Sequence, residues 1–484
     1  MIQYSIEQSI WNNAKKNPDK IALKSGKEAV SYRDLCSNIL AAKNFFENLP
    51  FYSKGSTIII AAGKQLSFAY AYFGAHLADI KVIPIDAETN QTRFQHIVDV
   101  TSPICVIGFD KIDTSITKFS LRDFDKLNGI DNLEYNNFPT LSEIADILFT
   151  TGTTGTPKGV PLTFENESAA ARNINTFIKN TEDDIELLAL PISHSFGLGR
   201  MRCCLSKGAT LILLGSFVNV KRIFSIIETE KVTGFTMVPA SWKFLQKMSG
   251  NQLSNYANQL KYIEMGSAYF SADDKKELAN LFPNTRVTMH YGLTEASRST
   301  FMEFHNDDSH LNSVGKASPY TDIKIFDEQG NILPENVEGE ICIKGEHVTK
   351  GYLNTSPESF FWNEYFRTGD WGLMDKDGYV YLKSRKKELI NVGGKKVSPL
   401  EVEDQLLLFQ GIEDCACIAI PDPNGVLGEV VKAYIVKSAG ADFTFEELTK
   451  FLSGKLESYK IPVSYEWIKE IPRTQNGKIQ RNLL

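Results

Sequence analysis

The sequence predicts an α/β and α+β protein, with a large N-terminal domain of parallel βαβ sheets plus a small distorted β-barrel, followed by a small α+β C-terminal domain. Three observations predict this class. Short apolar runs alternate with helical stretches in the first part of the chain, which is typical of βαβ units. Segments between Ile323 and Val348 alternate apolar and polar residues, as antiparallel strands do. Residues 388–484 then mix helical and strand patterns.

The N-terminal elements follow from apolar spacing. Residues 5–50 are predicted to form two helices around a short strand pair, and Ser31 can cap the second helix. The runs 57–62 and 81–86 are predicted as buried strands, whereas residues 110–140 are polar and predicted to be irregular. The remaining predicted elements of this part are a helix over 68–78, a helix over 163–178, and strands over 210–215 and 232–238.

The C-terminal elements begin after a turn and a charged junction. Residues 375–379 contain an Asp-Gly turn, and the charge cluster of residues 384–399 marks a domain boundary. Cys415 and Cys417 alternate with apolar neighbours, which predicts buried strand positions. The elements expected beyond the junction are helices over 400–408 and 445–456 and strands over 414–420 and 430–436.

Composition excludes several classes of protein. The chain has 484 residues, 42% hydrophobic and 23% charged, which is ordinary for a globular protein of about three domain-sized units. A net charge of -7 without Lys/Arg runs argues against nucleic-acid binding. No apolar run is long enough to cross a bilayer, and the N-terminus does not resemble a secretory signal. Seven cysteines without CxxC spacing predict reduced thiols and a cytoplasmic protein.

Residues 148–160 contain the strongest local signal. A buried strand, residues 144–149, leads into a loop of threonines and glycines that ends at Lys158. Glycines allow backbone N–H groups to approach a ligand, hydroxyls add donors, and the lysine adds charge, so the loop suits a phosphate or pyrophosphate. It is not a Walker loop, because Pro157 precedes Lys158. The alternative is a flexible surface loop.

Four further motifs follow in order. The strand at residues 261–268 ends in small residues, and Tyr-Gly-Leu-Thr-Glu occupies residues 291–295. Arg-Thr-Gly-Asp occupies residues 367–370, and a lysine loop occupies residues 471–481. Taken singly, these patterns fit a tight turn, a helix cap, a second turn and a solvated surface lysine.

Together, these motifs resemble those of the adenylate-forming superfamily, which includes acyl-CoA synthetases, non-ribosomal peptide adenylation domains and beetle luciferases. The resemblance runs from about residue 148 to the end of the chain. Such enzymes activate a carboxylate with ATP to an acyl-AMP and pyrophosphate, and most pass the acyl group to a thiol. The resemblance therefore implies an AMP-forming acid–thiol ligase with ATP, Mg²⁺ and a thiol acceptor.

The resemblance assigns nucleotide-binding roles residue by residue. Tyr291 and Gly292 would lie by the adenine, Asp370 would accept the ribose hydroxyls, and Arg385 would contact the ribose or phosphate. Ser267 stands where the family usually has glycine, and it should still admit the ring. The residues that would cradle the phosphates are Thr150, Thr151, Gly152, Thr153, Thr154, Gly155 and Lys158, and those against the adenine ring are Gly266, Ser267 and Ala268.

The resemblance also assigns catalytic and conformational roles. Thr294 would contact the α-phosphate, Glu295 would bind Mg²⁺, and Lys478 would reach the carboxylate and the α-phosphate. His194 would line the channel to the acyl group. The implied domains are residues 1–386 and a mobile lid of residues 387–484, with Lys387 as the hinge and Gly393 and Gly394 beside the passing pantetheine arm.

The substrate and the acceptor are less determined. Amino-acid-activating relatives place an Asp just after the position of His194, whereas Ser195 follows here, so an acid without an α-amino group is expected. Arg200 and Arg202 could contact a polar or anionic acyl tail, or could be exposed or ion-paired. Coenzyme A is the expected acceptor. The alternatives are the phosphopantetheine arm of a carrier protein and a non-enzymatic protein that kept the fold.

Overall fold

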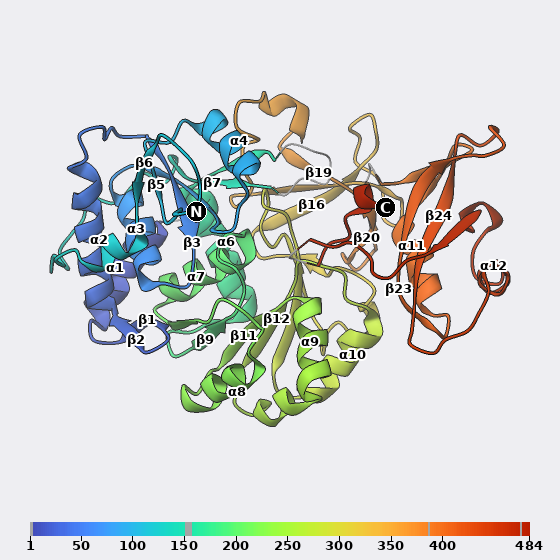
Figure 1. Cartoon of the computed structure of the whole chain (residues 1–484), viewed down its shortest axis with the longest axis horizontal. Coiled ribbons are helices and arrows are strands. Elements are labelled where there is room, and N and C mark those ends of the chain that lie inside the picture. The colour runs from blue at the N-terminus through green and yellow to red at the C-terminus, as the bar shows by residue number, and fades with distance from the viewer. Residues whose placement is uncertain (1–2, 151–156, 386–387, 475–476) are drawn as a thin grey trace.

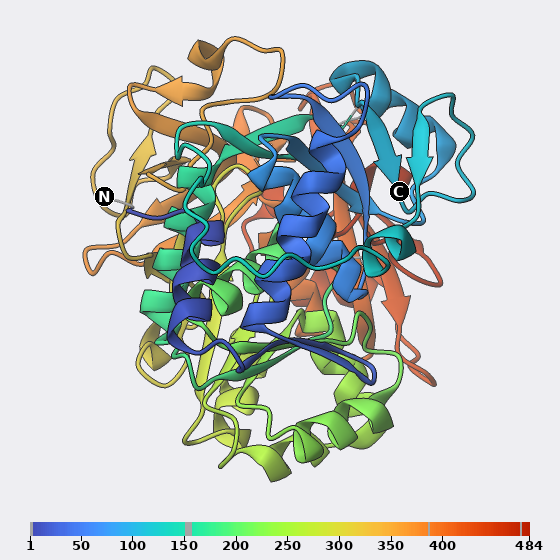
Figure 2. The ribbon, with the colours of Figure 1, turned by 90° about the vertical axis from the view of Figure 1, so that its left-hand side faces the viewer.

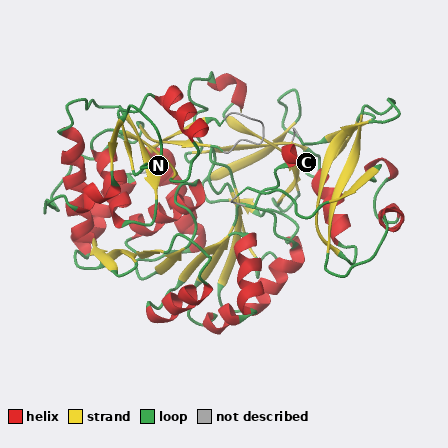
Figure 3. Cartoon of the chain, in the orientation of Figure 1, coloured by secondary structure: helices red, strands yellow, loops and turns green. Residues whose placement is uncertain are grey.

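The computed structural model describes residues 3–150, 157–385, 388–474 and 477–484. Figure 1 shows a large N-terminal part at the left, built on two sheets, and a smaller C-terminal unit at the right. Figure 3 shows helices lying between and outside the sheets of the large part. This arrangement confirms the predicted class of a large domain with parallel sheets followed by a smaller domain.

The first sheet has six strands in the order β6-β5-β3-β4-β7-β8. All neighbours pair in parallel except β8, which runs antiparallel to β7. Residues 58–60 of β3 are wholly buried, as a strand covered on both faces requires. The strands are β3 (Thr57–Ala62), β4 (Lys81–Asp86), β5 (Cys105–Ile107), β6 (Thr117–Phe119), β7 (Ile144–Phe149) and β8 (Gly159–Thr163).

The second sheet has nine strands in the order β15-β14-β13-β12-β11-β9-β10-β1-β2. Its central strands are parallel, while the hairpin β1–β2 and the run β13–β14–β15 are antiparallel. The strands are β1 (Ile21–Ser25), β2 (Glu28–Ser31), β9 (Ile185–Leu188), β10 (Thr210–Leu213), β11 (Gly234–Met237), β12 (Tyr262–Met265), β13 (Arg286–Tyr291), β14 (Thr300–Glu303) and β15 (Lys316–Ala317).

One layer of helices packs between the two sheets. A single apolar cluster joins α1, α2, α3, α6 and α7 to strands of both sheets, and every residue of α3 is buried. The blue helices near the N-terminus face the viewer in Figure 2. The helices of this layer are α1 (Ile6–Lys16), α2 (Tyr32–Glu47), α3 (Leu66–Leu77), α6 (Phe164–Ile178) and α7 (Ser195–Lys207).

Other helices cover the outer faces. A second apolar cluster packs α8, α9 and α10 on the nine-stranded sheet, and a third packs α4 on the six-stranded sheet. These helices are α4 (Gln91–Thr101), α8 (Val220–Thr229), α9 (Pro239–Ser249) and α10 (Ala272–Leu281).

The C-terminal part is built from smaller sheets. The segment expected to form a distorted barrel is an antiparallel sheet of β16 (Thr321–Phe326), β17 (Gly339–Gly345), β18 (Phe361–Trp362), β19 (Tyr365–Met374) and β20 (Val380–Arg385). Beyond it lie the hairpin β21 (Ile390–Val392) and β22 (Lys395–Val397), and the sheet β23 (Ile412–Pro421), β24 (Glu429–Lys437) and β25 (Ser464–Trp467). Helices α11 (Pro399–Leu407) and α12 (Phe445–Ser453) accompany them.

Most element predictions are confirmed. Strands 57–62 and 81–86 have the predicted bounds, Ser31 caps α2 with Asp34 in a capping box, and Cys415 and Cys417 are buried in β23. The prediction that residues 110–140 are irregular is wrong in part, because β6 and the short helix α5 (Leu121–Asp125) lie there. The five residues of α5 are too few for a periodic signal. Within the described residues, no helix is both long and apolar enough to span a membrane.

Candidate active site

The Thr/Gly loop joins the last two strands of the six-stranded sheet. Thr150 N–H donates to the Lys158 carbonyl at 3.1 Å, where β7 gives way to β8. The residues between these ends that were assigned to phosphate binding, Thr151, Gly152, Thr153, Thr154 and Gly155, lie outside the described residues. The exposed Lys158 ammonium lies 4.8 Å from the ring centroid of Tyr352, a cation–π distance.

Glu295 follows β13 and lies beside the same tyrosine. The Tyr352 hydroxyl donates to Oε1 of Glu295 at 2.6 Å, and Glu295 is buried. Burial raises the pKa of Tyr352, and the Glu295 carboxylate acts in the same direction, so the phenol keeps its proton and donates. Tyr352 thus connects two predicted site residues, Lys158 and Glu295. No pattern in the sequence marks Tyr352.

The proposed adenine segment requires a glycine at Gly266. A Cβ added there would lie 2.2 Å from Cε1 of His290, so no larger residue fits. The next residue, Ser267, has φ of 78°, the left-handed region that favours glycine. The family's glycine at this place therefore has a backbone reason, and this chain holds a serine there under strain. Gly292 is also required, because a Cβ added to it would lie 2.4 Å from the backbone nitrogen of Arg298.

Asp370 is buried in β19 with a partner on each carboxylate oxygen. The Tyr291 hydroxyl donates to Oδ2 at 2.6 Å, and Nε of Arg385 lies 2.8 Å from Oδ1. Burial raises the pKa of Asp370, while Arg385 and Tyr291 act in the opposite direction. Each carboxylate oxygen has capacity for a further hydrogen bond, as a ribose hydroxyl would need.

The structure brings Lys478 to these groups. A Cβ added to the neighbouring Gly477 would lie 3.8 Å from Ala240 and 3.9 Å from Ala268, so the terminal loop passes near the adenine segment. Lys478 is exposed, yet the protein around it lowers its pKa. The protein atoms around its ammonium are the main cause because they displace water from it; Arg385 acts in the same direction, against the carboxylates of Asp370 and Glu295.

His194 is the N-cap residue of α7, and Lys478 acts on it as well. Burial lowers the pKa of His194, with Arg93 and Lys478 in the same direction and Asp86 against them. Gly197 in the first turn of α7 is required, because an added Cβ would lie 2.2 Å from the Pro191 carbonyl oxygen. The chain therefore makes a tight turn at the start of α7, where His194 is the N-cap. His194 lies within electrostatic range of Lys478 in the C-terminal loop.

The two conformational predictions both stay predictions. Lys387, the predicted hinge, lies outside the described residues. Gly393 and Gly394 form the turn of the β21–β22 hairpin, with φ of 58° and 86°, and the Gly393 N–H donates to the Leu427 carbonyl at 2.9 Å. Two residues with positive φ suit a tight hairpin turn. Their predicted role beside a pantetheine arm stays a prediction.

A cavity of about 20 Å³ lies between α6 and α7 and reaches the Thr-Glu motif. It holds on the order of one water molecule. Its polar lining includes the half-buried Ser195 and Thr294 and the buried Glu167 and Arg202. The apolar part of its lining comes from Leu148, Leu162, Ala170, Ala171 and Ile174.

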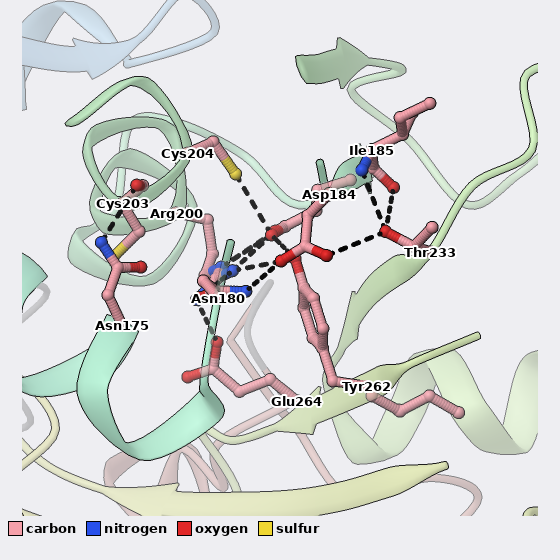
Figure 4. Close-up of polar contacts among 12 residues, drawn as sticks. Asn175, Asn180, Asp184, Ile185, Arg200, Cys203, Cys204, Thr233, Tyr262 and Glu264 are labelled. Atoms are coloured by element: carbon pink, nitrogen blue, oxygen red, sulfur yellow. Dashed lines mark hydrogen bonds and ion pairs between the residues drawn. The ribbon is translucent and has the colours of Figure 1, made fainter. Parts of the chain in front are cut away.

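The two arginines of α7 have different surroundings. Figure 4 shows Arg200 within a polar network that includes Asn180, Tyr262 and Glu264. Its Nε lies 2.9 Å from Oε1 of Glu186, its Nη1 lies 3.4 Å from Oε2 of Glu264, and it does not line the cavity. Ion pairing, the alternative that the sequence left open, is what the structure shows for Arg200. Arg202 lines the cavity and is ion-paired too.

Arg298 is a site residue that the sequence did not reveal. Its Nε donates to Oε1 of Glu264 in β12 at 3.2 Å, and its Nη1 and Nη2 donate to the carbonyls of Ser195 and Phe196 at 3.0 and 2.9 Å. Arg298 thus ties the strand that precedes Gly266 to the beginning of α7. It follows the Thr-Glu motif closely, but no residue pattern predicts its partners.

The chain is similar to known proteins over nearly its whole length. A family model described as AMP-binding enzyme matches residues 10–353, and one described as AMP-binding enzyme C-terminal domain matches residues 401–478. The chain is similar to the 2-succinylbenzoate–CoA ligase of Staphylococcus aureus (strain JH9), with 30% identity over 507 aligned residues, covering 98% of this chain and 99% of the relative.

Two solved structures share the fold. ATP-bound MatB from Rhodopseudomonas palustris superimposes with a TM-score of 0.88 at 23% identity, covering 99% of this chain and 97% of that one. The o-succinylbenzoate CoA synthetase MenE from Bacillus subtilis, in complex with its acyl-adenylate intermediate, superimposes with a TM-score of 0.87 at 24% identity, covering 100% and 98%.

Proposed function

The chain belongs to the AMP-binding enzyme family, and on this premise we propose that the α6–α7 cavity and the residues beside it are its active site. The protein is an AMP-forming acid–thiol ligase. It activates a small-molecule carboxylic acid with ATP to an acyl-AMP, releases pyrophosphate, and transfers the acyl group to coenzyme A. The observations that carry the site assignment are that Asp370 and Glu295 lie within electrostatic range of Lys478, and that Tyr291 and Arg385 contact the Asp370 carboxylate.

The nucleotide is held from three sides in this proposal. Asp370 accepts the ribose hydroxyls, the backbone around Gly266 lies against the adenine, and Lys158 neutralises phosphate charge. Each assignment has a structural support: Asp370 is buried and oriented by Tyr291, and Gly266 leaves no room for a side chain. Lys158 stands at the end of the Thr/Gly loop, where its ammonium meets the Tyr352 ring.

Glu295 fits the metal of the reaction. Its carboxylate supplies the oxygen ligand that magnesium prefers, and the Tyr352 hydroxyl fixes one of the two oxygens. Bound Mg²⁺ would offset the negative charge of the ATP phosphates. Thr294, the preceding residue, lines the cavity, which supports the contact with the α-phosphate that we propose for its hydroxyl.

Lys478 serves the first step. Attack of the acid's carboxylate oxygen on the α-phosphorus spreads negative charge over phosphate oxygens, and a cation already in place lowers the barrier without reorganisation. A Cβ added to Gly477 would lie 3.9 Å from Ala268, and this proximity of the loop supports an arrangement of the C-terminal unit in which Lys478 faces that reaction.

The second step uses another arrangement of the C-terminal unit. We propose that residues 387–484 rotate about Lys387 as a lid on residues 1–386, so that the Gly393–Gly394 turn replaces the Lys478 loop beside the acyl-AMP. The turn has open space on one side, since a Cβ added to Gly394 would meet nothing within 4 Å. A pantetheine arm could therefore pass close to its backbone.

The compartment and the acceptor complete the proposal. All seven cysteines are free thiols, which supports the cytoplasmic location that we propose. Coenzyme A is the acceptor, and the phosphopantetheine arm of a carrier protein is the alternative to be compared with it.

Pyrophosphate exchange tests the function directly. The purified protein is given ATP, Mg²⁺, labelled pyrophosphate and a panel of acids that includes 2-succinylbenzoate, the acid named for the Staphylococcus aureus relative. We expect acid-dependent label in ATP, and thioester when coenzyme A is added. If label entered ATP equally with and without an added acid, the proposed function would be contradicted. If thioester formed on a carrier protein but not on coenzyme A, the proposed acceptor would be contradicted.

A further inference from the structure

We infer that Lys396, in the β21–β22 hairpin, is a positioning residue that holds the C-terminal unit in the arrangement for acyl-AMP formation. It does so by reaching out of its own unit to Glu328 and Trp371 in the large N-terminal part. This inference rests on the proposed function, because it names a contact that must break before the Gly393–Gly394 turn can replace the Lys478 loop.

Lys396 makes two contacts with the large N-terminal part. Its Nζ donates to Oε1 of Glu328 at 2.8 Å and lies 4.2 Å from the ring centroid of Trp371, a cation–π distance. The side chains of Lys396 and Glu328 are 43% and 53% exposed, whereas Trp371 is buried. Since Trp371 directly follows Asp370 in β19, Lys396 contacts the strand whose carboxylate we assign to the ribose.

Both partners of Lys396 belong to ordered elements of one sheet. Glu328 lies in the turn that follows β16, where Oδ1 of Asp327 accepts hydrogen bonds from two backbone N–H groups further along the same turn, both at 2.8 Å. Trp371 lies in β19, which pairs with β17 and β20. The partners of Lys396 therefore keep a fixed position relative to Asp370.

The neighbouring Lys395 has its partner inside the C-terminal unit. Successive side chains of a β-strand point to opposite faces, and both lysines belong to β22. The Nζ of Lys395 lies 4.4 Å from the ring centroid of Tyr459, which belongs to the same unit. Lys395 therefore keeps its contact whichever arrangement the unit adopts, whereas the contacts of Lys396 depend on the arrangement.

The contacts of Lys396 go with the arrangement that the structure has. Asp370 and Glu295 lie within electrostatic range of Lys478, so these contacts coexist with the arrangement that we assign to the first step. Lys396 follows the Gly393–Gly394 turn in the same hairpin, so the two move together. A rotation that brings the turn to the acyl-AMP therefore carries Lys396 away from partners that stay with the sheet.

The exposure of the contacts sets the size of the effect. An exposed ion pair and an exposed cation–π contact are each weak, and together they favour one arrangement by about 3-fold to 10-fold. When the unit rotates faster than the chemistry, the rate of each step is proportional to the population of its arrangement. The ratio of the adenylation rate to the thioester rate then changes by the whole factor, whichever arrangement predominates.

The test compares both half-reactions in the wild type and in Lys396→Met, which removes the charge and keeps a long side chain. Single-turnover rates are measured for acyl-AMP formation from 2-succinylbenzoate, or from the best acid of the exchange panel, and for thioester formation from the supplied acyl-AMP and coenzyme A. Lys395→Met is the matched control, since it removes a cation–π contact of the same strand. Lys396→Arg is the conservative variant, because a guanidinium also pairs with carboxylates and stacks on rings. Thermal unfolding reports the folding of each variant.

We expect the ratio of the adenylation rate to the thioester rate to fall by about 3-fold to 10-fold in Lys396→Met. Glu328→Gln should lower the ratio as well, and should lower it less when Lys396 is already replaced, because part of its effect is the same ion pair. Lys395→Met and Lys396→Arg should keep the ratio close to that of the wild type.

A second measurement reports the arrangement without the reaction. Spin labels on Lys221→Cys in α8 and Lys450→Cys in α12 mark the two parts of the chain at exposed positions, and the native cysteines are all buried. We expect Lys396→Met to move population from the main label–label distance of the wild type to a second distance, and Lys395→Met to leave the distance distribution unchanged.

Three outcomes would overturn the inference. If a folded Lys396→Met variant keeps the wild-type ratio of rates, the enzyme is a ligase and Lys396 does not hold its C-terminal unit. If the variant instead loses thioester formation with a higher KM for coenzyme A, Lys396 serves the acceptor. If no acid of any kind supports AMP formation in the wild type, the proposed function is wrong, and the inference is wrong with it.

Discussion

The Tyr352 hydroxyl donates a hydrogen bond to Oε1 of Glu295 at 2.6 Å, so a residue outside every recognised motif orients the carboxylate that we assign to magnesium. Tyr352→Phe removes this bond and little else. We expect the Mg²⁺ concentration for half-maximal adenylation to rise by about 10-fold to 100-fold, as for the loss of an outer partner of a metal ligand. The rate of acyl-AMP formation measured over a series of Mg²⁺ concentrations gives this value for each protein.

The control for this variant is Tyr365→Phe, which removes a similar phenol–carboxylate bond, to Asp322, at the exposed surface. That variant should leave the magnesium requirement unchanged. Equal magnesium curves for wild type and Tyr352→Phe would show that Glu295 does not need its partner or is not the ligand.

Lys478→Ala should separate the two half-reactions. Asp370 and Glu295 act electrostatically on its charge, and we propose that this charge serves only the attack on the α-phosphorus. We expect adenylation to slow by about 100-fold or more, while thioester formation from supplied acyl-AMP changes little. Single-turnover assays of each step provide the measurement, with Lys469→Ala, an exposed lysine of the same unit, as control. An equal loss in both steps would contradict this role.

Ser267→Gly should stabilise the protein. Ser267 has φ of 78°, and a non-glycine residue in the left-handed region carries strain on the order of 1 kcal/mol. We expect the free energy of unfolding in urea to rise by about that amount, with the KM for ATP unchanged. Ser267→Ala keeps the Cβ and should give no gain. A glycine variant no more stable than wild type would show that the local backbone is not strained.

The buried His76 should make stability fall as pH rises. Its folded pKa, about 10, lies above its ordinary value of 6.5 because Asp146 and Glu7 accept its hydrogen bonds. The stabilisation is complete below about pH 6.5 and is lost as pH rises towards about 10, with a slope of at most about 1.4 kcal/mol per pH unit for one proton. Glu167, whose folded pKa is also raised, adds to the same decline.

Urea unfolding of wild type and His76→Gln across that pH window checks this prediction. The variant should be less stable at neutral pH, and its stability should decline less between about pH 6.5 and 10. Parallel curves for the two proteins would mean that His76 is neutral in the folded state.

Lys387→Pro tests the lid movement. Proline fixes φ near about −65° and removes an N–H donor, so the substitution should trap one arrangement of the C-terminal unit. We expect thioester formation from isolated acyl-AMP to fall far more than acyl-AMP formation, because in the described structure Lys478 already lies within electrostatic range of Asp370 and Glu295, the residues that we assign to the first step. The measurement is the pre-steady-state rate of each step in the variant and in the wild type. If both fell equally, or neither fell, the rotation about Lys387 would be wrong.

The sequence by itself determined the elements whose signal is local. Strands β3 and β4 have the predicted bounds because a parallel strand buried on both faces must be apolar throughout. The Thr-Glu motif of residues 291–295 was recognisable because its residues are contiguous. The strain at Ser267 was not visible, since a left-handed φ comes from the turn that the surrounding strands impose.

Only the tertiary structure decided which polar residues meet. Glu7, His76, Asp146, Glu167 and Arg202 come from separate elements, and packing of the helix layer against the sheets brings them into one network.

Arg200 and Arg202 show most clearly what could not be predicted from the sequence alone. Two positions along a helix are separated by roughly 200° of rotation, so one arginine pairs with Glu186 while the other reaches the cavity. The sequence presents both as equivalent cations, because the choice between them depends on which face of α7 packs against the neighbouring strands and which faces α6.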